Sequence, residues 1–219
     1  MKKVFSFALA LALAESVVAQ APQGDSAPAA PPAKVHKLGM ALVPQAIFYD
    51  GLRVDVQPYL TPQHQLVIAP QFYYAKQPSS LYSEKISKLQ GVGLELDYRV
   101  FPNKGKTLYC AAGLNYNYYR AEYMSVGMYQ TGTENGLPLY EYGEALNEQT
   151  INRVGASVMM GLQVGTLYGF FFDLYAGMGF RYSAVGKKFD DSISFDNGMW
   201  DVGYTGTYLV LGFKLGIDL

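Results

Sequence analysis

Half of the 219 residues are hydrophobic, only 16% are charged, and 17 basic against 18 acidic residues give a net charge of −1. Soluble domains usually carry about 25% charged residues, so the shortfall indicates that much of the surface faces something other than water. A nearly neutral chain also lacks the positive charge of nucleic-acid-binding proteins, and we expect no nucleic-acid partner. On composition alone, a tyrosine-rich soluble β-sandwich is an equal alternative.

The first 19 residues have the three parts of a secretory signal peptide. Lys2 and Lys3 give a positive start, residues 4–14 form an apolar run, and residues 17–19 (VVA) precede a cleavage point. The apolar run is too short to span a bilayer. We therefore assign residues 1–19 to a signal peptide and expect an exported protein.

A proline- and alanine-rich stretch separates this segment from the rest of the chain. Residues 20–35 have a composition that buries no core, so we expect an extended periplasmic linker. From residue 36 the pattern changes to alternation with period two, which is typical of strands with two different faces. We assign residues 36–219 to one β domain.

Alternating stretches predict eight antiparallel strands in this domain. They lie at 37–48, 51–60, 65–75, 88–101, 106–122, 150–166, 169–185 and 203–219. In 88–101, for example, Val92 and Leu94 share one face, whereas Glu95 and Asp97 share the other. The first stretch is the weakest because it contains a proline.

The predicted connections alternate between short and long from the second onward. The short ones are 61–64, 102–105 and 166–168. The long ones are 76–87, 123–149 and 186–202. Outer-membrane barrels have short periplasmic turns and long external loops, and a soluble sandwich has no reason to follow this rule. The first connection, 49–51, is the one imperfect fit, because it should lie outside and yet is short.

The polar face carries charges in mid-strand, which suit a narrow, salt-bridged barrel interior better than a dry soluble core. We expect an ion-pair network inside the barrel from Arg53, Arg99, Arg153, Arg181, Lys214, Asp55, Glu95, Asp97, Asp173 and Asp218. Five charges of each sign favour a closed lumen over a selective pore. The register places Asp173 opposite Lys214, and we predict that they pair. We also expect an acidic periplasmic half of the interior and a basic outer half. The periplasmic half would hold Arg99, Lys214, Glu95, Asp97, Asp173 and Asp218, and the outer half Arg53, Arg153, Arg181 and Asp55.

Glycine and the aromatic residues also follow the predicted strands. Glycines such as Gly161 and Gly177 fall on the inward face, where small residues relieve crowding in a narrow barrel. We expect aromatic rings in two bands at the membrane interfaces. The outer band would hold Tyr74, Tyr116, Tyr118, Tyr182 and Tyr208. The periplasmic band would hold Phe101, Tyr109, Tyr168 and Phe170.

The histidines argue against an enzyme. His36 precedes the first strand and His64 lies in a predicted periplasmic turn, so neither reaches the outer side, where a Ser-His-acid arrangement would work on lipid. We expect no catalytic residues, no metal site and no cofactor. Loop 123–149 is acidic and tyrosine-rich without lysine or arginine, which leaves open a recognition surface or a solvated cap.

Several segments resemble small Bacteroidetes-type outer-membrane β-barrel proteins. They are GLRVDVQPYLTPQHQLVIAPQFYYA, RVGASVMMGLQVG, FFDLYAGMGFRYS and YLVLGFKLGIDL. The resemblance covers roughly 39–75 and 88–219 and is most specific at 173–183. It implies an eight-stranded barrel of the general OmpA/OmpX shape, and it carries over no activity and no catalytic residue.

The sequence therefore predicts an all-β, eight-stranded, up-and-down transmembrane barrel in the outer membrane of a Gram-negative cell, with both termini in the periplasm. We expect a non-enzymatic, closed barrel that serves as a structural protein or an accessory subunit of an envelope complex. Its expected partners are outer-membrane lipid, the barrel-assembly machinery during biogenesis and other envelope proteins. The alternative is a surface adhesin or ligand-binding barrel acting through loops 123–149 and 186–202. A lipid-modifying enzyme and a small pore are less favoured.

Overall fold

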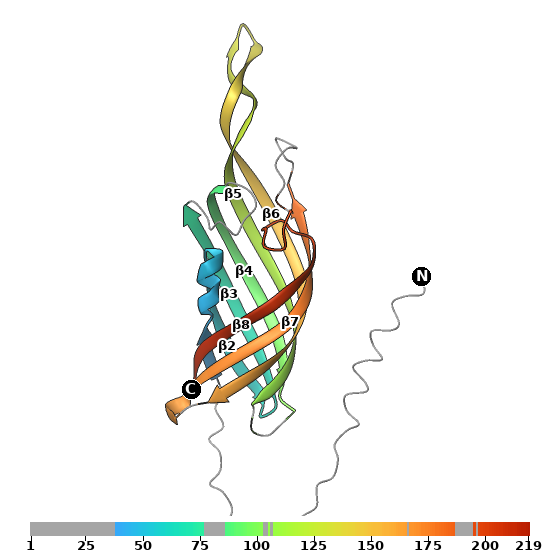
Figure 1. The fold of residues 1–219 in the computed structure, drawn as a ribbon. Helices are drawn as coiled ribbons and strands as arrows, with labels where there is room; N and C mark the ends of the chain where they lie inside the picture. The colour runs from blue at the N-terminus through green and yellow to red at the C-terminus, as the bar shows by residue number, and fades with distance from the viewer. Residues whose placement is uncertain are drawn as a thin grey trace, which may run out of the picture. The chain divides into compact units, whose positions relative to one another are not determined.

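The computed structural model describes residues 38–76, 86–102, 105, 107–165, 167–186, 195 and 197–219. Within this part of the chain, eight antiparallel strands follow one another and close into one barrel (Figure 1). They are β1 (Leu38–Leu42), β2 (Gly51–Thr61), β3 (His64–Lys76), β4 (Ile86–Val100), β5 (Leu108–Glu134), β6 (Leu137–Gly165), β7 (Phe170–Val185) and β8 (Gly206–Asp218). The predicted all-β, up-and-down architecture is confirmed. The predicted signal peptide and linker lie outside the described residues.

The two faces of the strands are distributed as the alternation predicts. On β7, Leu174, Met178 and Phe180 are about half exposed on the outer wall, whereas Asp173, on the opposite face of the strand, is fully buried. On β4, Val92 and Leu94 face outward in the same way. The barrel therefore has an apolar outer wall and a polar interior, which is the reverse of a soluble barrel.

The first predicted strand, 37–48, is wrong in its second half. β1 ends at Leu42, and the 3-10 helix η2 (Pro44–Tyr49) follows it. Proline has no backbone N–H for a strand ladder but fits the first turn of a helix, which explains the change at Pro44. Asp50, with a left-handed φ of 56°, ends the helix. The first connection is therefore 43–50, and it is longer than predicted.

The connections define two ends of the barrel. We call the end with the short connections 62–63, 101–107 and 166–169 the turn end; the last of these contains the 3-10 helix η3 (Leu167–Gly169). The opposite end, with η2 and the three other connections, we call the hairpin end. With η2 in place, the first connection is longer than the connection 62–63 that follows it, as the predicted alternation requires at this point.

The predicted loop 123–149 is a β-hairpin. β5 and β6 stay paired to Glu134 and Leu137, and they turn at Asn135 and Gly136, which have φ values of 51° and 81°. Two left-handed residues of the type Asn-Gly are the strongest signal for a two-residue hairpin turn. β4 last pairs with β5 at Tyr123, so residues 124–147 form a two-stranded ribbon that projects from the barrel (Figure 1).

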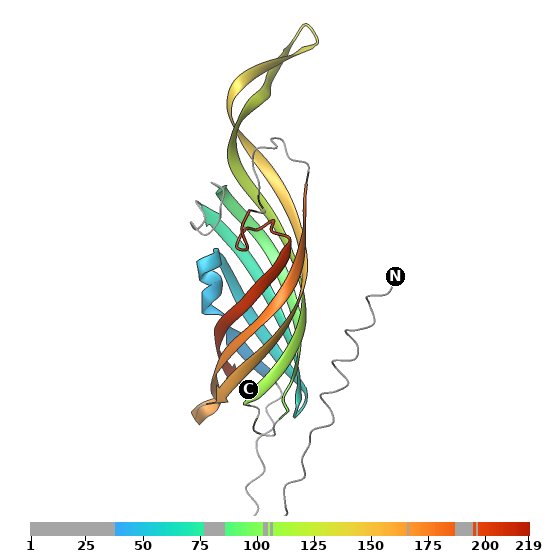
Figure 2. The same ribbon diagram turned by 45° about the vertical axis from the view of Figure 1, so that its right-hand side comes forward.

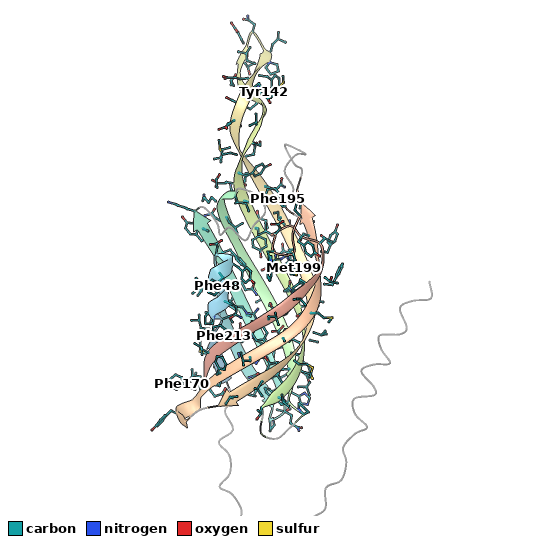
Figure 3. The ribbon with its side chains drawn as sticks, in the orientation of Figure 1. Phe48, Tyr142, Phe170, Phe195, Met199 and Phe213 are labelled. Atoms are coloured by element: carbon teal, nitrogen blue, oxygen red, sulfur yellow. The ribbon has the colours of Figure 1, made fainter. Side chains whose placement is uncertain are left out.

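Two apolar clusters lie inside the barrel. One, at the hairpin end, includes Leu89, Tyr119, Tyr123 and Ile151, and Phe195 packs on Tyr123 with ring centroids 5.4 Å apart (Figure 3). The other lies at the turn end and is formed by Phe101, Tyr109, Ala111 and Met159. Charged side chains lie between these two clusters.

The predicted aromatic bands need a correction at three positions. Phe101 and Tyr109 are almost fully buried inside the barrel, and Tyr208 points inward to hydrogen-bond with Asn115. Tyr109 shares the inward side of β5 with Ala111 and Gly113, so strand parity overrides its position near a strand end. The remaining predicted band residues, Tyr74, Tyr116, Tyr118, Tyr182, Tyr168 and Phe170, are exposed.

Among the described residues, no helix combines the length and apolarity that a membrane span requires.

Candidate functional site

Arg53 connects three carboxylates inside the barrel. Its Nε lies 2.7 Å from Asp55 Oδ1 on the same strand, and its Nη1 lies 2.7 Å from Glu95 Oε2 on β4. Its Nη2 is 3.8 Å from Asp97 Oδ2. Because residues two apart on a strand point to the same face, Arg53 and Asp55 meet without any distortion of β2.

A second group of ion pairs lies closer to the turn end. Arg99 Nη1 on β4 is 3.0 Å from Asp173 Oδ2 on β7, so this pair crosses the lumen. Tyr109 donates its hydroxyl proton to Asp173 Oδ1 at 2.7 Å, and Arg99 stacks over the Tyr109 ring. Lys214 on β8 pairs with Asp55. Arg99, Asp173, Lys214 and Asp55 have no exposed surface, so the group is a dry charged plug.

The expectation for Asp173 and Lys214 holds in register and fails in pairing. The two residues are direct partners in the β7–β8 ladder, as predicted. Their side chains pair elsewhere, however, Asp173 with Arg99 and Lys214 with Asp55. The lumen of an eight-stranded barrel is narrow, and long side chains can reach past the neighbouring strand. Two ion pairs, Arg53 with Glu95 and Lys214 with Asp55, also connect the predicted periplasmic and outer halves of the interior.

Three further predicted lumen residues lie outside both the plug and the Arg53 group. Arg153 donates to the hydroxyl of Tyr119 and stacks over its ring, with 4.8 Å from Cζ to the centroid. Arg181 donates to the backbone carbonyl of Met199 and stacks on Tyr208. Asp218, at the end of β8, accepts a hydrogen bond of 3.4 Å from Tyr59. The ten predicted residues thus separate into the four plug residues, Arg53 with Glu95 and Asp97 next to them, two arginines nearer the hairpin end, and Asp218 at the turn end.

A cavity of about 200 Å³ lies between the plug and the hairpin end. Three arginines line it, namely Arg53, Arg153 and Arg181, together with Glu95 and several uncharged polar side chains. Trp200, from the β7–β8 connection, and Gln45, from η2, complete the wall on one side. The sequence did not reveal this cavity, because Gln45 falls in the part of the first predicted strand that is helical.

One of the two histidines, His64, belongs to the described residues. His64 begins β3 at the turn end, and its Nδ1 lies 2.8 Å from the hydroxyl of Tyr98. His36 lies outside the described residues. Across the described ranges, no three histidine, cysteine or acidic residues come together as a metal site.

Comparison with known proteins does not assign the chain to a family. No protein-family model matches the chain. A search of curated proteins also finds no significant sequence similarity.

Proposed function

We propose that this protein spans the outer membrane as a closed, non-enzymatic β-barrel and acts as a structural or accessory subunit of an envelope complex. The observation that carries the proposal is the inverted barrel: apolar side chains such as Leu174 and Met178 cover the outside, while ion pairs are buried inside. Water would disfavour this outer wall, whereas lipid hydrocarbon stabilises it.

The strand lengths and connections support the same proposal. β4, β7 and β8 have 15, 16 and 13 residues, and about 9–11 residues are enough to cross the hydrocarbon. The connections at the turn end are all short, whereas the hairpin end carries η2, the long β7–β8 connection and the projecting ribbon. We place the turn end in the periplasm, and the hairpin end then faces outward. Both ends of the barrel domain would lie on the periplasmic side.

The charged plug supports a closed lumen, because side chains rather than water fill the turn-end half. We expect the purified protein to give no steady conductance when it is inserted into planar lipid bilayers. Insertion is checked separately by protease protection of the barrel in vesicles. Large, steady channels from inserted protein would contradict the closed barrel.

The ribbon formed by residues 124–147 supports a role in protein contact. Large apolar side chains cover it, including Met128, Leu137, Tyr140 and Tyr142, and each is at least 62% exposed. Tyr142 is labelled on the ribbon in Figure 3. An exposed apolar surface on a projecting element marks an interaction site, and the glutamates of the ribbon favour a partner with a basic rim.

Shortening the ribbon tests this role. Residues 126–144 are removed and Ser125 is joined to Ala145, its ladder partner, through an Asn-Gly turn. We expect the barrel to fold normally and to lose the envelope proteins that co-purify with the full chain in mild detergent. A control variant keeps the ribbon length and changes its turn, Asn135-Gly136, to Asp-Gly. Unchanged co-purification from the shortened barrel would contradict the proposal.

The same ribbon also favours the runner-up function, a surface adhesin. The two are distinguished by where the partner is found. An adhesin captures its ligand from outside on whole cells and yields no stable complex from purified envelopes, and the shortened variant should then lose cell-surface binding alone.

A further inference from the structure

The wall of the barrel has a seam beside β1. β1 pairs with β8 only from Gly39 to Leu42, whose partners are Asp218 and Leu215. Its pairing with β2 ends at Leu42 and Val54. β8 continues to Gly206 and β2 to Gly51, so toward the hairpin end no strand of the described part of the chain lies between them. The helix η2 occupies this place and contacts both strands (Figure 2).

Individual side chains, rather than a strand ladder, hold η2 in the seam. Gln45 donates a hydrogen bond to the hydroxyl of Tyr175 inside the barrel. It passes Gly212 of β8 so closely that a Cβ at this glycine would lie 2.0 Å from the Gln45 amide nitrogen. Tyr49 stacks on Trp200, and Phe48 points away from the barrel (Figure 3). The helix therefore closes this part of the barrel wall, and its outer side is apolar.

The cavity reaches the outer wall at this seam. Its lining includes Leu52 of β2 and Leu209 and Leu211 of β8. All three leucines are about half exposed on the outer wall. A cavity bounded by lumen arginines and by outer-wall leucines is accessible from the side of the barrel.

The interior of the cavity favours an anion. Arg53 is neutralised by the three carboxylates around it, but the contacts of Arg181 are backbone carbonyls and tyrosine rings, which carry no charge. Arg153 lines the same space. The hydroxyl of Ser157 is buried in the wall and has no hydrogen-bond partner among the described residues. Positive charge and an open hydroxyl, next to an apolar exit, match a molecule with an anionic head and an apolar tail.

We propose that this cavity binds an anionic single-chain amphiphile from the membrane. The phosphate or carboxylate head contacts Arg153 and Arg181 with Ser157 beside it, and the chain leaves through the seam over Leu209 and Leu211. The inference goes beyond the proposed function and rests only on its membrane-spanning part. Arginine suits this task because its planar guanidinium binds phosphate and carboxylate with paired hydrogen bonds.

Trp200 makes the binding measurable, because it lines the cavity and is the only tryptophan in the chain. The full barrel in dodecyl maltoside micelles is titrated with dodecyl phosphate while tryptophan fluorescence is recorded. We expect a saturable change. Parallel titrations use inorganic phosphate, which has the head without the chain, and dodecylphosphocholine, whose head is zwitterionic. A comparable saturable response to either compound would overturn the anionic-amphiphile site.

Two matched double variants distinguish the effect of the cavity arginines on binding from the effect of the protein's overall charge. Arg153→Gln/Arg181→Gln removes two charges from the cavity, and Lys88→Gln/Arg120→Gln removes two charges from ion pairs outside it. We expect binding at least about tenfold weaker in the first and unchanged in the second, since charge-assisted bonds supply the affinity. Equal affinity in both variants would overturn the proposal.

A third variant covers the case in which the arginine variant does not fold. Ser157→Leu keeps both arginines and fills the head-group space, and it should weaken dodecyl phosphate binding to the same degree; wild-type affinity in this variant would overturn the site. The unheated mobility of each variant in dodecyl sulfate gels reports its folding. Loss of binding in a barrel that still inserts and still co-purifies its partners concerns this site alone and leaves the proposed function intact.

Discussion

Replacing Arg99 with methionine is expected to destabilise the folded barrel by about 3–5 kcal/mol. Arg99 and Asp173 are both completely buried, with 3.0 Å between Nη1 and Oδ2. Without the arginine, Asp173 keeps the hydroxyl of Tyr109 but loses its charge partner in a site that water does not reach. A urea titration in lipid vesicles, followed by the fluorescence of Trp200, measures the free energy of unfolding.

An exposed ion pair provides the control for this substitution. Arg120 pairs with Glu148 at the barrel rim, where both side chains are about half exposed. Arg120→Met should leave the unfolding midpoint unchanged, because solvent screens such pairs. A second comparison, Arg99→Met/Asp173→Leu, should recover part of the lost stability by removing the stranded carboxylate. Equal effects of Arg99→Met and Arg120→Met would show that the plug does not stabilise the barrel.

Gly177→Ala should also lower the free energy of unfolding strongly, by about 3 kcal/mol, because the new methyl group would overlap with main-chain atoms of the neighbouring strand. A Cβ at Gly177 would lie 2.2 Å from the carbonyl oxygen of Val158 and 2.7 Å from the Cα of Met159. Both atoms belong to the main chain of β6, which pairs with β7 from Ile151 to Gly165, so neither can move aside locally. The free energy of unfolding is again measured by urea titration. The mobility of unheated samples in dodecyl sulfate gels gives the folded fraction.

Gly127 offers the same chemical change in open space. It lies in the ribbon, and no atom comes within 4 Å of a Cβ placed there. Gly127→Ala should therefore leave stability unchanged or slightly higher, since alanine restricts the unfolded chain. If Gly177→Ala were as stable as Gly127→Ala, the inner faces of β6 and β7 would be farther apart than the structure places them.

The strands that could be predicted are those with one apolar and one polar face. β3, β4 and β7 lie within a few residues of their expected ranges, because the outer wall and the lumen select opposite side chains at alternate positions. β1 failed because Pro44 ends it early. The sequence predicts a loop where the ribbon lies. Both faces of the ribbon are exposed, so nothing there selects for apolar and polar residues at alternate positions.

The candidate site was predictable in part for the same reason. Periodicity gives the inward direction of Arg99, Asp173 and Lys214, and strand counting gives the register of the last two. It does not give the partner of a long side chain that reaches past neighbouring strands, as Lys214 does to Asp55. The cavity depends on η2 and on the β7–β8 connection, and neither has a repeating pattern from which its contacts could be read.

The length of the ribbon determines how far its tip lies from the barrel. From Tyr123, the last residue of β5 paired with β4, to the turn after Glu134, each strand adds about 3.3 Å per residue, or roughly 35 Å in all. In an outer membrane this distance carries the tip well clear of the lipid head groups. A partner bound at the tip would not need to approach the bilayer. A bulky partner could therefore bind even though the barrel, with eight strands, is narrow.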